Sequence, residues 1–191
     1  MYKILKVKGD VRVPPEKFGK DLKESVEESV REKYEGVLDP KVGIILNVEE
    51  VEEVGEGRII PGDGAVYYPS KFKLLVFSPI LHEVVLGEVV DVTEFGAFIR
   101  IGPLDALVHV SQVMNDYVSY DEKNAIFTGR ETKKSLKEGD PVRIRVISIS
   151  MSPGKENKIG LTMRQPNLGS LAWIEQEKRK TKKAAKPVKK K

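Results

Sequence analysis

Cysteine is absent from the 191-residue sequence, and histidine occurs only as His82 and His109. The absence of thiols excludes disulfides, zinc ribbons and cysteine nucleophiles. Two histidines supply few metal ligands, and the plentiful Asp and Glu residues show no calcium-loop spacing of the D-x-[DN]-x-[DN]-G kind. A cation site built from carboxylates alone stays open, but we expect no cofactor and no metal site.

Long apolar runs are also missing. No stretch of the sequence approaches the ~20 apolar residues of a membrane-spanning helix. Residues 1–8 lack the uninterrupted apolar stretch of a secretory signal. The hydrophobic fraction of 40% and the charged fraction of 32% are typical of a globular protein. The sequence therefore predicts a cytoplasmic location.

Charge is unevenly distributed along the chain. The formal net charge is +4, but residues 178–191 contain nine Lys or Arg residues and no acid, so the remainder holds 24 basic and 29 acidic residues. A basic end of this kind gains affinity for a polyanion by releasing counterions. The same composition is typical of a disordered solubilising end. We expect residues 174–191 to form a disordered basic tail, and both roles remain open.

The first half of the chain predicts an α+β domain over residues 1–80, with an antiparallel sheet and one main helix. Alternating apolar and charged residues up to Pro14 predict a strand. Residues 16–34 predict an amphipathic helix that ends at Gly36. Its apolar positions, four residues apart, are Phe18, Leu22, Val26, Val30 and Tyr34, and we expect them in the core. Residues 42–54 and 65–77 predict two further strands.

Residues 55–69, between these strands, have the unusual sequence GEGRIIPGDGAVYYP. Exposed apolar and aromatic residues in a loop rich in glycine and proline are typical of a docking surface. We expect a tip loop near residues 55–68 that docks on a protein partner. Its candidate docking residues are Ile59, Ile60, Pro61, Tyr67 and Tyr68. The alternative is that both tyrosines lie on a strand and one of them faces the core.

Residues 81–173 predict a second domain, an all-β OB barrel. Ser78-Pro79 is the expected boundary, because proline interrupts a strand and a new series of short strands follows it. The predicted strands are residues 82–93, 95–101, 106–110, 141–151 and 158–164. The long connection between the third and fourth of these contains an insertion near residues 115–138.

Residues 87–113, GEVVDVTEFGAFIRIGPLDALVHVSQV, carry the chemistry of this domain. Phe95 and Phe98 are an odd number of residues apart, so they face opposite sides of a regular strand. A bulge near Gly96 would bring both rings to one face. With His109 they would form a platform on which RNA bases stack, at about 1–3 kcal/mol per base. The alternative is that one phenylalanine fills the barrel end and His109 hydrogen-bonds a neighbouring loop.

The spacing of glycine, aromatic residues and histidine resembles the S-one RNA-binding domain, an OB domain first described in a ribosomal protein. The resemblance covers residues 82–164 and implies that the two phenylalanines and the histidine contact RNA. In that family the last two strands usually add an acidic residue and an arginine. Here those positions hold Ser150 and Lys158, so a cation remains and the acid is lost. The candidate RNA contacts are Phe95, Phe98, His109, Arg100 and Lys158.

Over residues 1–173 the chain resembles the RNA polymerase stalk subunits, a family that includes the archaeal E-prime subunit and the seventh subunit of the eukaryotic enzyme. The start MYKILKVKGDVRVPPEKFG, the bend at residues 55–77 and the interrupted barrel carry this likeness. The family implies an accessory, non-catalytic subunit of DNA-directed RNA polymerase in archaeal transcription. Such a subunit docks on the polymerase core through its tip loop, pairs with the polymerase F subunit and presents its barrel to the emerging RNA.

Two other functions remain open from the residues alone. A translation-associated RNA-binding protein would share the barrel, and an RNA-processing nuclease would use the barrel to deliver its substrate. A nuclease needs clustered acids to hold metal ions. Glu49, Glu50, Glu52 and Glu53 are instead spread along one predicted strand. We interpret them as a solvated face or as a face for a basic partner.

Overall fold

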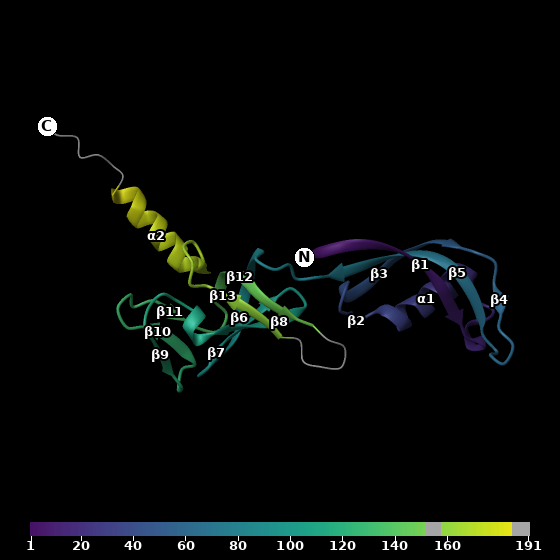
Figure 1. Cartoon of the computed structure of the whole chain (residues 1–191), viewed down its shortest axis with the longest axis horizontal. Helices are drawn as coiled ribbons and strands as arrows, with labels where there is room; N and C mark the ends of the chain where they lie inside the picture. Colours follow the sequence, from purple (N-terminus) through teal and green to yellow (C-terminus); the bar gives the residue numbers. More distant parts are fainter. Residues whose placement is uncertain (152–157, 185–191) are drawn as a thin grey trace. The chain divides into compact units, whose positions relative to one another are not determined.

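The computed structural model describes residues 1–151 and 158–184. The chain divides into two compact units, the first formed by Met1–Pro79 and the second beginning at Ile80. Figure 1 shows the helices and strands of both units. In the described part of the chain, no helix is both long and apolar enough to cross a membrane.

The N-terminal unit is an antiparallel sheet with one helix packed on it (Figure 1). Its elements are β1 (Tyr2–Val13), a 3-10 turn (Pro15–Lys17), α1 (Leu22–Tyr34), β2 (Leu38–Asp39), β3 (Gly43–Val54), β4 (Arg58–Ile59) and β5 (Val66–Phe77). The strand order is β1-β5-β3-β2, and β4 pairs with β5. An antiparallel sheet can leave one face in water, and α1 packs on the other face against β1 and β3.

The main helix is shorter than the sequence predicts. We expected it to begin at residue 16, but α1 begins at Leu22. The carboxylate of Asp21 accepts hydrogen bonds from the backbone N–H groups of Lys23 and Glu24, which caps the helix at that point. Gly19, with φ of +95°, turns the chain ahead of the cap. The end of the helix was predicted correctly.

The core of the N-terminal unit lies between α1 and the sheet. Its buried residues are Val11, Val13, Val26, Val30, Ile45, Val48, Val51, Phe72, Leu74 and Val76. Of the helix residues that we expected in the core, Val26 and Val30 are buried, and Tyr34 packs half-buried against Phe72. Phe18 is exposed because it precedes the delayed helix start, and Leu22 is exposed at the first position of α1.

The second unit contains a closed barrel of five strands, as the sequence predicts for an OB fold. The strands are β6 (Val84–Thr93), β7 (Gly96–Ile101), β8 (Leu104–His109), β12 (Pro141–Ser150) and β13 (Lys158–Thr162). The order β13-β8-β7-β6-β12 closes through a further pairing between β12 and β13. Closure requires tight coiling of β6, and a Cβ on Gly87 would lie only 2.7 Å from the backbone oxygen of Arg100. The predicted fold class is confirmed for both units.

The insertion between β8 and β12 forms a small sheet of its own. After a 3-10 turn (Val110–Gln112), the strands β9 (Val118–Asp121), β10 (Ile126–Gly129) and β11 (Ser135–Leu136) follow. Phe127 of β10 and its cross-strand partner Leu136 of β11 are fully buried. The hydroxyl of Tyr120 donates to the backbone oxygen of Val92, at 3.2 Å, which joins the insertion to the barrel.

A second helix, α2 (Leu171–Ala184), follows the short strand β14 (Gly169–Ser170). We expected disorder from residue 174, and this expectation is corrected as far as residue 184; residues 185–191 lie outside the described residues. The helix is anchored by the indole of Trp173, which donates to the backbone oxygen of Ser135 at 3.1 Å. Lys134 lies over the same ring and pairs with Glu177 at 2.6 Å. These tertiary contacts outweigh the disorder that the lysine-rich composition favours.

Candidate nucleic-acid interface

Strand register places several predicted RNA contacts on one face of the barrel. Gly96 of β7 pairs with His109 of β8, so these two positions point to the same side. Phe98 and Arg100 follow Gly96 at two-residue intervals and therefore face the same way. The residues between them, such as Ile99, are buried inside the barrel. The outward face of β7 and β8 therefore carries the ring of Phe98, the guanidinium of Arg100 and the imidazole of His109.

The last strand of the barrel extends this face. Gly160 of β13 pairs with Leu107, which is the cross-strand partner of Phe98. Lys158 lies two residues before Gly160 and points to the same side. It is exposed, and it has no ion-pair partner within residues 1–151 and 158–184. Ser150 lies opposite it on β12.

Phe95 joins the same surface from the turn before β7. Its side chain is 52% exposed, and its ring centroid lies 6.0 Å from that of Phe98, with the two planes at 88°. The backbone oxygen of Phe95 accepts a hydrogen bond of 2.9 Å from the N–H group of Val110, the residue after His109. Edge-to-face packing leaves ring surface available for stacking. Phe95 is exposed and Phe98 is half-buried, so neither is enclosed as a core residue.

The bulge that we predicted near Gly96 lies elsewhere. The irregular register is in β6, between Val89 and Asp91. The two rings meet because Phe95 precedes β7, and a turn residue does not obey the alternation of the strand. Gly96 has a different role: a Cβ there would collide with the backbone oxygen of Val108. The glycine therefore permits the close approach of β7 and β8.

His109 is exposed at the end of β8, and the following turn orients it. Its Nδ1 lies 2.9 Å from Ser111 Oγ and accepts from the backbone N–H of Ser111 at 3.3 Å. This is the loop hydrogen bond that the sequence allowed as an alternative, yet it leaves the ring exposed. A fixed and exposed ring loses little entropy when a base stacks on it.

Arg100 differs from the other candidate contacts, because it is already paired. Its Nε and Nη2 donate to the two carboxylate oxygens of Asp105, at 2.9 and 3.3 Å. This hydrogen bonding raises the pKa of Arg100. The pair lies across β7 and β8 on the platform face, so part of the guanidinium charge is neutralised there.

The tip loop of the N-terminal unit exposes apolar side chains on a fixed backbone. Ile59 is 74% exposed and Ile60 is 48% exposed, and Pro61 beside them is also exposed. Tyr67 and Tyr68 lie half-buried on β5, and Tyr68 packs against the core, as the alternative interpretation had it. The structure thus separates an exposed apolar tip from two tyrosines at its base.

A polar cluster holds this loop in place. Arg12 donates two hydrogen bonds to the carboxylate of Asp63, at 2.9 and 2.8 Å, and the hydroxyl of Tyr67 donates to the same carboxylate at 2.8 Å. Hydrogen bonds from Arg12 and then Tyr67 hold the pKa of Asp63 well below its usual range. Sequence reasoning missed this cluster, because Arg12 and Asp63 are 51 positions apart. Asp63 between two glycines was a turn signal, but its partner depends on strand register.

Three glutamates in the acidic run of β3, Glu50, Glu52 and Glu53, pair with lysines of its own sheet. Glu52 pairs with Lys6 at 2.9 Å and with Lys73 at 3.1 Å, and Glu50 pairs with Lys73 at 3.0 Å. Hydrogen bonds from Lys6 and then Lys73 lower the pKa of Glu52. In the described residues, no three His, Asp or Glu side chains are grouped so that they could hold a metal ion.

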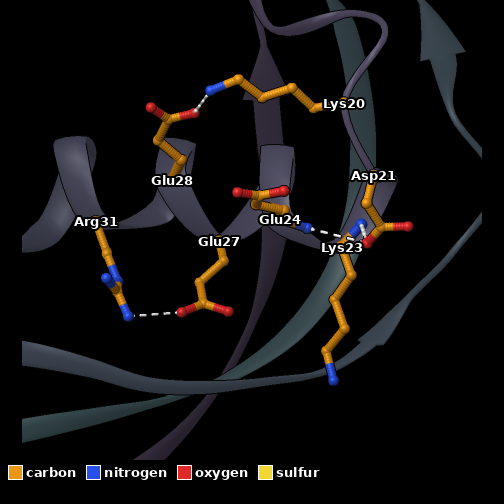
Figure 2. A pocket seen from close by; sticks show the side chains of 7 residues that line it. All are labelled: Lys20, Asp21, Lys23, Glu24, Glu27, Glu28 and Arg31. Carbon is orange, nitrogen blue, oxygen red and sulfur yellow. Dashed lines mark hydrogen bonds and ion pairs between the residues drawn. The ribbon is translucent and has the colours of Figure 1, made fainter.

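A cavity of about 610 Å³ is an open hollow beside α1 (Figure 2). Charged side chains of both signs line it. Lys20 pairs with Glu28 at 3.2 Å, Arg31 pairs with Glu27 at 2.6 Å, and Asp21 caps the helix. These charged groups are paired with one another, so the hollow is a solvated face of the helix and presents no cluster of unpaired groups to a ligand.

Comparisons with known proteins match both units. The model of the "SHS2 domain found in N terminus of Rpb7p/Rpc25p/MJ0397" matches residues 8–64, and that of the S1 RNA binding domain matches residues 78–163. DNA-directed RNA polymerase subunit Rpo7 of Sulfolobus acidocaldarius is 43% identical over 177 residues, which cover 93% of this chain and 97% of the relative. The chain belongs to the Rpo7 family of DNA-directed RNA polymerase subunits. E-prime is a synonym for Rpo7.

The Rpo7 likeness extends to other archaeal and eukaryotic relatives. Rpo7 of Saccharolobus solfataricus is 41% identical, with 94% of this chain and 100% of the relative covered. DNA-directed RNA polymerase III subunit RPC8 of Bos taurus is 23% identical, with 91% and 98% covered. These matches span nearly the whole of each relative, so the family assignment applies to both units together.

Proposed function

We propose that the chain is a non-catalytic stalk subunit of DNA-directed RNA polymerase that pairs with the polymerase F subunit and binds the emerging transcript. The observation that carries the RNA-binding part is the edge-to-face contact of Phe95 and Phe98 beside the exposed His109. Bases of any sequence can stack on such rings, since every base has a π-face. A transcript has no fixed sequence, so a stacking platform suits it better than base-specific hydrogen bonding.

Lys158 supports the electrostatic part of this function. It lies on the platform face without an ion-pair partner among the described residues, and a cation near stacked bases attracts the RNA phosphates. Arg100 is a weaker contributor, because Asp105 competes for its guanidinium. Binding of this kind holds RNA and requires no residue of the chain to take part in nucleotidyl transfer.

The tip loop supports docking on the polymerase core. Ile59, Ile60 and Pro61 form an exposed apolar tip, and the cluster of Arg12, Asp63 and Tyr67 fixes the backbone below it. An apolar loop held in one conformation loses little entropy when a partner covers it. Pairing with the F subunit is proposed from the family resemblance.

The deciding experiment is affinity capture of the tagged full-length chain from native lysate. We expect the F subunit and the polymerase core subunits to be recovered with it, and co-expression with the F subunit to improve its solubility. An Ile59→Asp/Ile60→Asp variant should lose the core subunits and keep the F subunit. Recovery of ribosomal proteins in place of polymerase subunits would favour a translation-associated protein and overturn the proposal.

A further inference from the structure

A cleft between the barrel and the insertion begins where the aromatic platform ends. Its volume is about 430 Å³, and it is open to solvent. Its lining residues are Ser111, Met114, Asn115, Asp116, Tyr117, Glu131 and Arg164. Ser111 is also the residue that orients His109. The cleft is therefore contiguous with the platform face.

Arg164 supplies the positive charge of this cleft. Its Nε and Nη2 donate to Asn115 Oδ1, at 3.1 and 2.9 Å. A neutral amide orients the guanidinium without cancelling its charge, and Arg164 has no acidic partner in the described residues. Arginine carries five N–H donors, so donors remain for a ligand phosphate. This arrangement contrasts with Arg100, whose charge an aspartate already balances.

Tyr117 supplies an exposed ring at the same cleft. Its side chain is 75% exposed, although its backbone oxygen is held by a hydrogen bond of 2.9 Å from the N–H group of Arg130. Such a ring on a fixed backbone is suited to stack on an unpaired base. Tyr117 lies outside the barrel core, so packing of the protein interior does not account for the position of this ring.

The wall of the cleft is held by Asp116. Its carboxylate accepts hydrogen bonds from the backbone N–H groups of Thr132, at 2.9 Å, and Glu131, at 3.1 Å, and from the Thr132 hydroxyl at 2.8 Å. The Thr132 bonds in particular lower the pKa of Asp116. A Cβ on Gly129 would lie 2.5 Å from Asp116 Oδ2, so a larger residue there would displace this carboxylate. Asp116 is thus occupied, and Glu131 is the carboxylate left to meet a ligand.

The combination of groups indicates the ligand. A carboxylate repels phosphate but accepts hydrogen bonds from the amino and imino groups of bases. Tyr117 offers stacking and Arg164 offers a phosphate contact. We propose that this cleft binds the nucleotides of single-stranded RNA that follow those on the platform, with a base on Tyr117, a phosphate at Arg164 and Glu131 hydrogen-bonded to the base edge. The inference rests on the proposed RNA-binding function.

The test compares two RNA lengths on the full-length chain in complex with the F subunit, by fluorescence anisotropy. An RNA of about four nucleotides fills the platform, and one of about ten nucleotides also reaches the cleft. Tyr117→Ala should weaken binding of the long RNA by about 5- to 150-fold, as expected for one lost stack, and leave the short RNA unchanged. Tyr117→Phe, which keeps the ring, should behave as the unmodified chain. Glu131→Gln should change the preference among bases at the far end of the long RNA.

The remaining outcomes separate the two proposals. If the unmodified complex binds neither RNA, the proposed RNA-binding function fails before the cleft is tested. If the complex binds both RNAs and Tyr117→Ala changes neither, the cleft is not an RNA site. Equal losses for both RNAs would also overturn the inference, because Tyr117 would then act on the platform or on folding. Loss of a partner protein by the Tyr117→Ala complex, with both RNA affinities unchanged, would assign the cleft to that protein.

Discussion

The open faces of the two β-structures differ in how their polar groups are satisfied. On the N-terminal sheet, several lysines and glutamates of β1, β3 and β5 pair with one another, as Glu50 does with Lys73. On the barrel, Phe95 and His109 are exposed, and Lys158 has no acidic partner in the described part of the chain. A face whose charges are already paired offers little binding energy to a ligand. A face with exposed rings and an unbalanced cation can gain energy from RNA.

The largest expected effect comes from removing the rings of the barrel face. Phe98→Ala/His109→Ala should weaken RNA binding by about 2–6 kcal/mol, roughly 30- to 20,000-fold, since each lost stack is worth about 1–3 kcal/mol. Thermal unfolding should change less than for a buried phenylalanine, whose truncation costs roughly 3–5 kcal/mol. Affinity and unfolding are measured on the same variant. The matched control is Lys6→Ala/Lys73→Ala on the N-terminal sheet, which should bind RNA nearly as the unmodified chain does.

A second expected effect concerns the charged cluster at the base of the tip loop. Asp63→Asn removes the carboxylate that Arg12, Tyr67 and the Ala65 N–H group share. Hydrogen exchange at the Ala65 amide should become faster, because the single amide oxygen of asparagine is a weaker acceptor than the carboxylate and must also serve Arg12 and Tyr67. Exchange at Val30, buried against the sheet, should be unchanged. Equal acceleration at both positions would mean that the substitution unfolds the whole unit.

The same variant predicts a pH dependence. The pKa of Asp63 is lowered in the folded state, so its contribution to stability is complete above the unfolded pKa of about 3.9 and is lost as the pH falls through the folded value. The difference in stability between the unmodified chain and Asp63→Asn should therefore be constant near neutral pH and shrink below about pH 4. Urea unfolding at a series of pH values measures it. A difference that grows on acidification would contradict the assigned role of Asp63.

A smaller effect should follow from changing the pairing on the barrel face itself. Asp105→Asn removes the acid that balances Arg100, so the platform gains one unpaired cation. RNA affinity should rise a few-fold, and the salt dependence of log K should steepen by up to about 0.7, the value for one additional contact to single-stranded phosphate. Arg100→Ala/Asp105→Asn should abolish the gain. If Asp105→Asn weakens binding, the ion pair serves to orient Arg100 for RNA and does not only neutralise the charge of its guanidinium.

The fold was predictable to the extent that local patterns determine it. Alternation located β1, β3 and β5, and the glycine and aromatic spacing located the barrel. The start of α1 was predicted too early, because the four-residue spacing of Phe18 and Leu22 continues the helical pattern while the Asp21 cap begins the helix later. Helix α2 was missed because its lysine-rich composition favours disorder, and the anchoring of Trp173 depends on tertiary contacts.

The residues of the candidate site could be predicted from the sequence, but their arrangement in space could not. Phe95, Phe98 and His109 were singled out from their spacing, but the way that the rings meet depends on the turn before β7. The pairing of Arg100 with Asp105 required the register of β7 and β8. The cleft at Arg164 combines residues from the insertion with the segment after β13, and no local pattern relates the two.

The smallest expected effect concerns the charge pairs of the N-terminal sheet. Lys71 and Glu53 are cross-strand neighbours 2.7 Å apart, and both side chains remain substantially exposed. The hydrogen bond that Lys71 donates to Glu53 raises the pKa of Lys71, so its contribution is complete below the unfolded pKa of about 10.4 and is lost as the pH rises through the folded value. Water and salt screen such a pair, with a Debye length of about 10 Å at 0.1 M ionic strength. The pair should therefore add little to stability.

A double-mutant cycle on Lys71→Gln and Glu53→Gln measures that contribution by urea unfolding. The coupling should be small at neutral pH and should vanish in high salt, whereas Phe72→Ala on the same strand should cost roughly 3–5 kcal/mol at any ionic strength, because that ring is fully buried. A large coupling that survives high salt would show that the charged face is a rigid network. The proposed contrast would then break down, since both open faces would be organised surfaces and the N-terminal one would itself become a candidate for partner binding.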